Sequence, residues 1–558
     1  MVSLSTAFST GYRPQRYTND EMRMHMAKLT GADYLAQTLL AHGATTVFGI
    51  PGGRILPLYD AMYRRRAQLR HVLTAHEQAA AHAADGWARA LLLSGQRDAV
   101  GVCIATSGPG STNLITGIAT AYADSSPVVA LCGNVPTRLV GTDSFQEADI
   151  VGMTMSITKS NRTVRAIDEL PRTLDEAFTL ARTGRPGPVL VDLPEDVLTA
   201  RAEHLPAPNA APTMPKPLPT PNAQALARAA EMIAAAKHPV IMAGGGAVRA
   251  GSNITRLAQA LGAPMVFSLM GLSAVPASHP LNLGMAGLYG SREANAALED
   301  CDLLIALGVR FSDRWGFRAE GTHPAERRII HVDIDRAELG KNLDPHCYLH
   351  GDAGTVAALL TPANVRPRVD APGLPASRTY AQPDSPESTR LIAALATALG
   401  PEAAIVTDVG AHQMAVARHY PFAQGDCLIT SGGMGTMGFG LGAAIGACLA
   451  RPGSPTALVT GDGSLRMSLG ELGTVAALDL PLIIAVMDNH VLGMVRDLQT
   501  QHYGRRHYAV TSPGVDWPGI ARSFGIHALH ADNAESLASA VSSARGRGKP
   551  ALIACNIP

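Results

Sequence analysis

The sequence predicts an α/β protein of three domains, each a parallel sheet flanked by helices. Short apolar runs rich in β-branched residues alternate with alanine-rich helical stretches along the chain, which is typical of parallel sheets covered by helices. Two proline-rich segments, 203–224 and 361–389, interrupt this alternation and are typical of linkers. With 558 residues, the chain is also too long for one compact core.

Each expected strand is an apolar run that ends at a turn. Ligands of such folds bind at the carboxyl ends of the strands, so we expect functional residues in the loops that follow these runs. The expected strands cover 44–50, 98–106, 127–133 and 188–193 in the first domain, 239–244, 263–269, 302–308 and 328–334 in the second, and 403–410, 455–461, 480–487 and 550–556 in the third.

The linkers divide the chain into segments of domain size. The first residues are polar and lack an apolar signal core, so we expect a disordered extension rather than a targeting peptide. The expected organisation is an N-terminal extension at 1–29, a first domain at 30–200, a linker at 201–224, a central domain at 225–362, a second linker at 363–388 and a third domain at 389–558.

Composition argues against several classes of function. Lysine plus arginine and aspartate plus glutamate both number 46, so the net charge is zero, and without blocks of like charge we expect neither a nucleic-acid nor a membrane partner. No apolar run has transmembrane length. The seven cysteines are scattered, with no pair at metal-ligand spacing, so the simplest interpretation is a cytoplasmic protein with reduced thiols.

The third domain carries the clearest chemical signal. The strand at 455–461 runs into the turn GDGS at 461–464, and the next strand ends near Asn489. If these strands are neighbours, the Asp462 carboxylate, the Asn489 amide oxygen and the carbonyl of Val491 converge as ligands for a divalent ion such as Mg²⁺. The turn glycines and the helix amides that follow would meet phosphate oxygens. An ordinary glycine turn is the alternative.

Other local signals are weaker. The segment GMGTMG at 433–438 follows a strand-like CLITS and matches the dinucleotide fingerprint GxGxxG, whose acidic partner would be Asp462. Because the GDGS turn already uses Asp462, a glycine loop that admits a flat cofactor ring is the better interpretation. His412 could bind a phosphate or cap a helix. Glu77 lies in the alanine-rich stretch 73–89, a predicted helix, and could simply interact with the helix macrodipole.

Longer motifs occur in all three domains. The GDGS turn with Asn489 looks like the thiamine-diphosphate signature, and it is accompanied by VGAHQM, SGGMGTMGFGLGAAIGA and DNHVLGMV. The first domain adds VFGIPGGRILPLYDAM, HEQAAAHAADGWAR, ATSGPGSTNLITGIATAYADSSPVV, DSFQEADIVGM and GRPGPVLVDLPEDV. Together these motifs resemble the acetolactate synthase (acetohydroxyacid synthase) large-subunit family, over the chain from about residue 30 to residue 558.

The resemblance implies that the first domain binds the pyrimidine of thiamine diphosphate and the third binds its diphosphate and Mg²⁺. Glu77 would hydrogen-bond N1′ of the aminopyrimidine and favour the imino tautomer that removes the thiazolium C2 proton. The residues implied in catalysis are Glu77, Gly53, Phe145 and Gln146. Those implied in thiamine-diphosphate binding are Glu77, Pro51, Gly52, Asn113, Gly410, Ala411, His412, Gly435, Met437, Gly461, Asp462, Gly463, Ser464, Asn489, Val491, Leu492, Gly493 and Met494, and those implied in metal binding are Asp462, Asn489 and the carbonyl of Val491.

The central domain resembles the FAD-binding part of the family through FSLMG, GMAGLYG, GVRFSDR, HVDID and HGD. Guanidinium groups of Arg185 and Arg310 would meet the flavin phosphates, and Asp333 and Asp352 would bind the ribose and the adenosine end. The implied set is Arg185, Gly244, Gly245, Gly246, Ser268, Leu269, Met270, Gly287, Leu288, Tyr289, Gly308, Val309, Arg310, Asp313, Arg314, Asp333, Ile334, Gly351 and Asp352. A structural Rossmann-like domain without cofactor is the alternative.

The chain departs from the family pattern around the substrate. Asp497 and Leu498 stand where the family has the tryptophan that favours 2-ketobutyrate as second substrate, and Glu195 replaces a lysine. We therefore expect an altered acceptor pocket. Further departures replace a tyrosine, a histidine, an aspartate and a glutamine by Ile50, Tyr289, Ser312 and Ala411.

We therefore expect a transferase of the acetolactate synthase type that uses thiamine diphosphate, Mg²⁺ and FAD. It would decarboxylate a 2-keto acid, by default pyruvate, and transfer the two-carbon unit to a second carbonyl compound. Three alternatives stay open. The first is a relative that accepts an aldehyde, a ketone or a sulfonated substrate, or that simply decarboxylates. The others are a non-catalytic paralogue and an FAD oxidoreductase. Because the family divides its active site between subunits, we expect a homodimer or homotetramer, with a regulatory small subunit as a possible partner.

Overall fold

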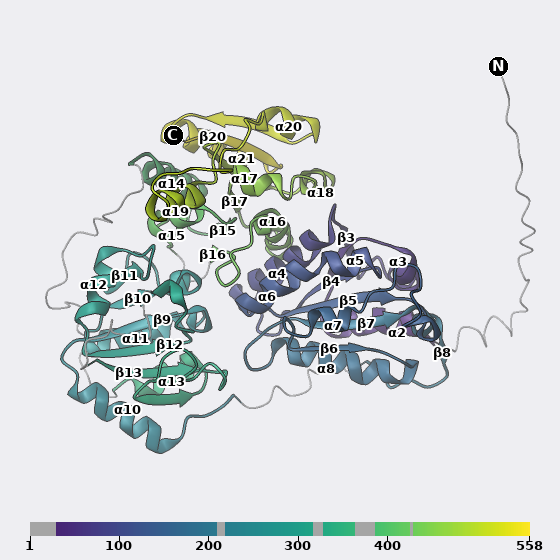
Figure 1. Ribbon diagram of the computed structural model, residues 1–558, viewed down its shortest axis with the longest axis horizontal. Helices are drawn as coiled ribbons and strands as arrows, with labels where there is room; N and C mark the ends of the chain where they lie inside the picture. Colours follow the sequence, from purple (N-terminus) through teal and green to yellow (C-terminus); the bar gives the residue numbers. More distant parts are fainter. Residues whose placement is uncertain (1–28, 209–217, 316–326, 363–385, 424–427, 558) are drawn as a thin grey trace, which may run out of the picture.

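The computed structural model describes residues 29–208, 218–315, 327–362, 386–423 and 428–557 (Figure 1). The predicted N-terminal extension up to residue 28 and parts of both predicted linkers lie outside the described residues. Three α/β units follow one another along the chain, each built on a six-stranded sheet, and all neighbouring strands within these sheets are parallel (Figure 1). The predicted fold class is therefore confirmed.

The first sheet has the strand order β3-β2-β4-β5-β7-β6. A short antiparallel pair, β1 (Leu29–Thr30) with β8 (Arg201–Ala202), joins the two ends of this unit. The strands are β2 (Thr46–Gly49), β3 (Arg70–Leu73), β4 (Gly101–Ala105), β5 (Val128–Asn134), β6 (Ser160–Thr163) and β7 (Val189–Pro194). The helices are α2 (Gly31–Ala41), η1 (Gly53–Ile55), α3 (Leu56–Arg64), α4 (Glu77–Leu93), α5 (Pro109–Asn113), α6 (Ile115–Asp124), η2 (Thr137–Leu139), α7 (Ile150–Thr154), η3 (Ile167–Glu169), α8 (Leu170–Arg182) and α9 (Glu195–Thr199).

The second sheet has the order β11-β10-β9-β12-β13-β14. The chain runs outward from β9 in one direction and then returns to β12 on its other side, so a topological switch point lies between β9 and β12. The strands are β9 (Pro239–Ala243), β10 (Met265–Phe267), β11 (Asn282–Met285), β12 (Leu303–Leu307), β13 (Arg328–Asp333) and β14 (Cys347–His350). The helices are α10 (Ala223–Ala235), η4 (Gly245–Ala247), α11 (Gly251–Leu261), η5 (Leu269–Ala274), α12 (Arg292–Asp300), η6 (Asp313–Trp315) and α13 (Ala353–Leu360).

The third sheet has the order β16-β15-β17-β18-β20-β19. Its strands are β15 (Ala404–Thr407), β16 (Leu428–Ile429), β17 (Thr456–Gly461), β18 (Leu482–Asp488), β19 (His527–Ala531) and β20 (Ala551–Asn556). The helices are α14 (Pro386–Leu399), α15 (Ala411–His419), α16 (Phe439–Ala450), α17 (Asp462–Arg466), α18 (Glu471–Ala477), α19 (Gly493–His502), α20 (Trp517–Ser523) and α21 (Ala534–Arg547). In all three units, every run that we expected to be a strand overlaps with one, and β5, β7 and β18 extend one residue beyond the expected run.

Helices α4 and α16 lie side by side and join the first unit to the third (Figure 1). Glycine makes this close approach possible, because a Cβ at Gly86 would lie 2.1 Å from the carbonyl oxygen of Ala443. Likewise, a Cβ at Gly446 would lie 1.9 Å from the carbonyl oxygen of Ala83. One hydrophobic core continues through both helices into the two sheets. The alanine-rich stretch therefore packs tightly against another helix.

The start of α4 corrects one expectation. The helix predicted over 73–89 begins at Glu77, since Leu73 is the last residue of β3. The cause is local: Nδ1 of His76 accepts a hydrogen bond from the backbone nitrogen of Gln78 at 3.1 Å and caps the helix there. Glu77 is thus the first helical residue.

Two further expectations concern the compartment. None of the six described cysteines forms a disulfide, and all are buried. Within the described ranges, no helix combines the length and the apolar character needed to cross a membrane.

Candidate active site

Glu77 lies in a narrow environment at the carboxyl end of the first sheet. Nδ2 of Asn113 donates a hydrogen bond to Oε2 of Glu77 at 2.9 Å. Gly110 borders the other carboxylate oxygen, because a Cβ there would lie 3.3 Å from Oε1 of Glu77. Glu77 is only 8% exposed. The structure thus brings together two residues implied in cofactor binding and orients the carboxylate through one of them.

The turn before Glu77 is held by the third unit of the same chain. Oε1 of Glu471, the first residue of α18, accepts hydrogen bonds from the backbone nitrogens of Ala75 and His76 at 2.9 and 3.0 Å. Burial raises the pKa of Glu471, while these N–H groups and the Thr474 hydroxyl favour its ionised form. Glu77 therefore projects from a turn that is fixed at the boundary between two units.

Gly53 and Gln146, which the resemblance implies in catalysis together with Phe145, lie in or beside the loops that follow β2 and β4. A Cβ at Gly53 would meet no atom within 4 Å, so the backbone there faces open space. A Cβ at Gly108 would lie 2.9 Å from the carbonyl oxygen of Gln146, which places Gln146 against the β4 loop. Phe145 is 79% exposed in the single chain. Pro51, Gly52 and Gly53 lie together in the turn after β2, and Gln146 lies beside the loop after β4.

A second cluster lies at the carboxyl ends of β17 and β18. These strands are neighbours, with Gly461 paired to Met487, so Asp462 and Asn489 follow adjacent strand ends. Oδ2 of Asp462 is buried and has no hydrogen-bond partner among the described residues. Oδ1 of Asn489 accepts a hydrogen bond from the Val491 backbone nitrogen at 3.2 Å. A buried carboxylate oxygen without a partner, near an amide oxygen, fits a divalent cation.

The composition of this cluster also restricts how a cation would be held. The part of the chain that the structure describes contains no group of three or more His, Cys, Asp or Glu side chains suited to a metal. One carboxylate, one amide and one carbonyl leave an octahedral shell incomplete, so phosphate oxygens or water would have to complete it.

His412 lies beside the same edge of the sheet. A Cβ at Gly410 would be 2.7 Å from Cε1 of His412, and a Cβ at Gly461 would be 2.8 Å from Nδ1, so both glycines make room for the ring. Nε2 of His412 is buried without a hydrogen-bond partner in the described ranges. Burial lowers the pKa of His412 to about 4, so the ring is neutral at pH 7 and can donate one N–H to an anion such as a phosphate.

The other residues implied in diphosphate binding surround this edge. A Cβ at Gly463 would lie 2.8 Å from Leu492 and 3.6 Å from Met437. A Cβ at Gly493 would lie 3.6 Å from both Ala411 and Asn489. The Ser464 hydroxyl donates to the carbonyl of Val409 at 2.8 Å, and Met494 packs against the hydrophobic core.

Asp408 holds the loop that carries Gly435 and Met437. Its carboxylate accepts hydrogen bonds from the backbone nitrogens of Gly438 and Gly440 at 2.9 and 3.0 Å. Burial raises the pKa of Asp408 to about 6, against the opposite effect of these N–H groups. Gly438 has φ +85°, a left-handed conformation that glycine adopts without strain.

The same loop is held on its other side by Asp124. Its carboxylate accepts hydrogen bonds from the backbone nitrogens of Gly432 and Gly433 at 3.3 and 2.6 Å. Backbone amides of the GMGTMG segment are therefore bound to protein carboxylates, whereas a dinucleotide fold needs such amides for the pyrophosphate. This arrangement supports the interpretation of a cofactor-facing glycine loop over a dinucleotide fingerprint.

Glycines meet at the switch point of the central sheet. A Cβ at Gly244, after β9, would lie 2.0 Å from the carbonyl oxygen of Gly308, after β12. A Cβ at Gly245 would lie 3.0 Å from Cβ of Met270, and a Cβ at Gly246 would also contact Gly308. Backbone this close to a switch point fits an elongated cofactor such as FAD.

The charged residues of the predicted FAD set differ in how far they are already engaged by other groups of the chain. Nη1 of Arg185 forms an ion pair with Glu338 at 2.8 Å, so this guanidinium is already engaged within the chain. Burial and the neighbouring Arg185 lower the pKa of Arg310, an effect that a bound phosphate would oppose. Burial raises the pKa of Asp333 to about 6, and Asp352 caps α13 by accepting from the Thr355 nitrogen at 2.8 Å. Arg310 fits the predicted role better than Arg185.

The remaining residues of that set lie in loops around the same sheet. The backbone nitrogen of Leu288 donates to the carbonyl of Arg314 at 2.9 Å, which joins two of the motifs. Asp313 and Arg314 are strongly exposed in η6. The set also includes Ser268, Leu269, Gly287, Tyr289, Val309, Ile334 and Gly351.

Comparison with known proteins identifies the family. Residues 29–153 match the N-terminal TPP binding domain of thiamine pyrophosphate (thiamine diphosphate) enzymes, residues 226–360 the central domain, and residues 408–555 the C-terminal TPP binding domain. The chain is 42% identical over 526 residues to a probable acetolactate synthase large subunit of Methanocaldococcus jannaschii, covering 90% of this chain and 87% of that protein. The chain belongs to the acetolactate synthase large-subunit family.

Two Escherichia coli K12 members of the family are similar over nearly their whole length. The acetolactate synthase isozyme 1 large subunit is 42% identical over 537 residues, which cover 94% of this chain and 93% of that protein. The isozyme 2 large subunit is 40% identical over 548 residues, which cover 95% and 96%.

Sequence reasoning missed the charged residues that hold the loops around the predicted site of this acetolactate synthase family member. Asp124 and Glu471 bind loops of another unit, Asp408 binds a loop within the third unit, and Arg89 pairs with Asp124. The available signal was Asp85 four residues before Arg89 on an alanine-rich helix, since charges inside a buried helix need partners.

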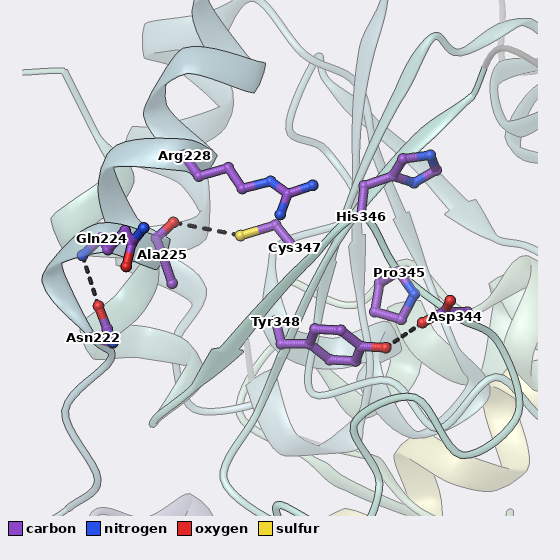
Figure 2. Close-up of a pocket in the computed structure, with 9 residues that line it drawn as sticks. All are labelled: Asn222, Gln224, Ala225, Arg228, Asp344, Pro345, His346, Cys347 and Tyr348. Atoms are coloured by element: carbon purple, nitrogen blue, oxygen red, sulfur yellow. Dashed lines mark hydrogen bonds between the residues drawn. The ribbon is translucent and has the colours of Figure 1, made fainter.

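A separate surface hollow of about 570 Å³ lies at the start of α10 and the amino end of β14 (Figure 2). In Figure 2 the Tyr348 hydroxyl points to Asp344, and Sγ of Cys347 points to the carbonyl of Ala225. No residue implied in acetolactate synthase chemistry lines this hollow. Its lining consists of Asn222, Gln224, Ala225, Arg228, Asp344, Pro345, His346, Cys347 and Tyr348.

Proposed function

We propose that this chain is a thiamine-diphosphate-dependent carboligase of the acetolactate synthase type. Two molecules of pyruvate and one proton would give one acetolactate and one carbon dioxide. The observation that carries the proposal is the buried, unpartnered carboxylate oxygen of Asp462 beside Asn489, in a chain of this family that also keeps the Glu77–Asn113 pair.

The side chains have distinct roles in this proposal. Bound thiamine diphosphate supplies the carbanion chemistry that decarboxylation and carbon–carbon bond formation require. Glu77, oriented by Asn113, would hold a proton shared with a pyrimidine nitrogen. Asp462, Asn489 and the carbonyl of Val491 would bind Mg²⁺, and His412 would donate to a diphosphate oxygen. Gly53, Phe145 and Gln146 would line the substrate side.

The domain assignment follows from these roles. We assign pyrimidine binding to residues 30–200, FAD binding to 225–362 and diphosphate binding to 389–558, with linkers at 201–224 and 363–388. The glycine crevice between β9 and β12 and the cation of Arg310 support FAD as a structural cofactor. The flavin absorbance of the purified protein tests this assignment. Stoichiometric flavin reduction during turnover would instead favour an oxidoreductase.

The active site is proposed to form between two copies of the chain. The resemblance to a family that divides this site between subunits supports a homodimer or homotetramer, which we place in the cytoplasm, and the large-subunit names of the relatives support a regulatory small subunit as partner. A monomer that remains active at high dilution in sedimentation would contradict the shared site.

Product identification tests the function. The purified chain is incubated with pyruvate, thiamine diphosphate, Mg²⁺, FAD and a panel of acceptors, and the products are identified by mass spectrometry. We expect acetolactate from pyruvate alone. Release of carbon dioxide without a carbon–carbon bond would indicate a decarboxylase, and no turnover would favour a non-catalytic paralogue.

A second acceptor class is favoured by one feature. Asp497 and Leu498 lie on α19, four and five residues after Gly493, where the family carries its tryptophan. An acidic residue disfavours an apolar pocket for a larger alkyl group. The panel therefore includes an aldehyde, a ketone and a sulfonated compound beside the 2-keto acids.

A further inference from the structure

Arg54 and Glu195 form an ion pair across the carboxyl end of the first sheet. Arg54 lies in η1 after β2, and Glu195 is the first residue of α9 after β7. Nη1 of Arg54 and Oε2 of Glu195 are 2.5 Å apart. Since β4 and β5 lie between β2 and β7, the pair spans the ends of two intervening strands. A Cβ at Gly133, near the end of β5, would lie 2.9 Å from the Arg54 carbonyl.

Thr106 connects the backbone of Arg54 to the residues around Glu77. The backbone nitrogen of Arg54 donates to Oγ1 of Thr106 at 3.3 Å. The methyl group of Thr106 would lie 2.5 Å from a Cβ at Gly52 and 2.8 Å from a Cβ at Gly110, and Gly110 in turn borders Glu77. The backbone of Arg54 is therefore connected to the surroundings of the proposed catalytic carboxylate through Thr106 and Gly110.

Fold stability does not account for the pair. The side chains of Arg54 and Glu195 are 28% and 33% exposed, and ion pairs that water can reach stabilise a fold by less than about 1 kcal/mol. The Glu195 turn is already fixed, because Asp196 accepts hydrogen bonds from the backbone nitrogen and the hydroxyl of Thr137 at 3.0 and 2.6 Å. Glu195 thus stands on a rigid turn and orients Arg54.

The guanidinium retains capacity for a second anion. It offers five N–H donors in a fixed plane, and the bond to Glu195 uses one of them. The remaining edge matches a carboxylate. Within the pair Arg54 carries the positive charge and Glu195 the negative charge, so Arg54 is the member that can bind an anion.

We propose that Arg54, oriented by Glu195, binds the carboxylate of the acceptor 2-keto acid and so selects anionic acceptors over neutral aldehydes. This specificity rests on the proposed carboligase function. The new carbon–carbon bond joins the two-carbon unit to the acceptor carbonyl carbon, whose oxygen takes up a proton, while the acceptor carboxylate stays unchanged. The donor carboxylate leaves as neutral carbon dioxide, so a cation bound to it would stabilise the ground state and slow decarboxylation.

A competition experiment with the holoenzyme tests the proposal. Pyruvate serves as donor and as acceptor in the presence of benzaldehyde, and mass spectrometry gives the ratio of acetolactate to the neutral hydroxyketone. Replacing Arg54 by Met keeps the length of the side chain but removes its charge and its donors. We expect Arg54→Met to lower the product ratio roughly 10-fold, the effect of one charge-assisted hydrogen bond. Arg54→Lys should restore part of the ratio.

Glu195→Gln tests whether Arg54 acts through its charge, because this variant and Arg54→Met should change the KM for the acceptor differently. This variant keeps an acceptor for Arg54 but removes the competing negative charge, so the KM for the 2-keto acid acceptor should fall or stay constant while Arg54→Met raises it. A merely structural pair would give both variants the same loss of thermal stability and the same product ratio. The matched control is Arg172→Gln, which breaks the exposed Arg172–Glu176 pair on α8 and should leave the ratio unchanged.

The outcomes separate this inference from the function on which it rests. If the wild-type chain forms no carbon–carbon bond from pyruvate, the proposed function fails. If the wild-type chain forms acetolactate but Arg54→Met keeps the wild-type product ratio, the role of Arg54 is refuted and the function stands.

Discussion

The guanidinium of Arg89 on α4 lies 3.0 Å from the carboxylate of Asp124 at the end of α6, and both side chains are buried. Nη1 of Arg89 also donates to the carbonyl of Thr430 at 2.7 Å, and Asp124 accepts from the nitrogen of Gly433 at 2.6 Å. The first unit thus holds the N-terminal side of the glycine loop that carries Met437, and Asp408 of the third unit holds its C-terminal side. A single buried ion pair couples the packing of two units to the proposed cofactor site.

Asp124→Ala should therefore weaken both folding and cofactor binding. The substitution removes one of the two carboxylates that pair with the buried Arg89 guanidinium, so the free energy of unfolding should fall by about 3 kcal/mol. The thiamine-diphosphate concentration for half-maximal activity should rise because the loop loosens. Denaturant unfolding and cofactor titration measure the two effects. Asp60→Ala is the control, since its exposed pair with Arg64 on α3 should contribute less than about 1 kcal/mol.

Glu77→Gln should abolish most turnover and spare cofactor binding. The amide keeps the shape and can still accept from Asn113, but it cannot hold the proton, so the turnover of pyruvate should fall about 100-fold or more. Unchanged turnover would refute the role of Glu77. Mg²⁺-dependent binding of thiamine diphosphate, followed by fluorescence titration, should be close to wild-type.

Asp462→Asn, unlike Glu77→Gln, should weaken cofactor binding. It removes the only negative charge among the proposed metal ligands, so Mg²⁺-dependent binding of thiamine diphosphate should weaken by at least about 10-fold. Titration with Mg²⁺ at fixed thiamine diphosphate measures the change. Wild-type Mg²⁺ affinity in this variant would move the metal site elsewhere.

Gly86→Ala should destabilise the contact between α4 and α16. The added methyl group would lie 2.1 Å from the carbonyl of Ala443, and overpacking of this kind costs about 1–3 kcal/mol. Thermal unfolding of Gly86→Ala and of a control variant measures the loss of stability. Gly546→Ala on α21 is the matched control, because a Cβ there meets no atom within 4 Å and the higher helix propensity of alanine should leave stability equal or raised.

Asp192 should make stability depend on pH. Burial raises its pKa to about 6, although Asn134 and Thr163 donate to Oδ2. Because the folded chain holds this proton more tightly than the unfolded chain, the stabilisation is fully present below about pH 4 and is lost as pH rises through about 6, a change of about 3 kcal/mol. Asp192→Asn should remove this part of the pH dependence, which unfolding at pH 4 to 7 would measure. Identical pH profiles of the two proteins would contradict it.

The strands separate what local pattern predicts from what it does not. The predicted runs are the four inner strands of each six-stranded sheet, and among the outer strands only β16, within CLITS, had a strand-like pattern. Inner parallel strands are covered on both faces, so they appear as continuous apolar runs. Several outer strands are partly exposed: β6 reads SNRT with no buried residue, and β14 alternates between buried and less buried positions, whereas β11 is buried throughout. Tertiary position, rather than propensity, makes these segments strands.

The sequence by itself determined the fold class, the inner strands and the placement of Asp462 and Asn489 at neighbouring strand ends, because a strand followed by a turn and a helix start is a local pattern, whereas the role of Glu77 was suggested only by the family resemblance. Only the tertiary structure decided which charges meet. Arg54 and Glu195 are 141 residues apart, and Glu471 and Ala75 are 396 apart. Such contacts depend on the order of strands within a sheet and on the packing of α4 against α16. Strand order and helix packing cannot be predicted from the periodicity of apolar residues, since a single polar contact between distant elements has no helical or strand period.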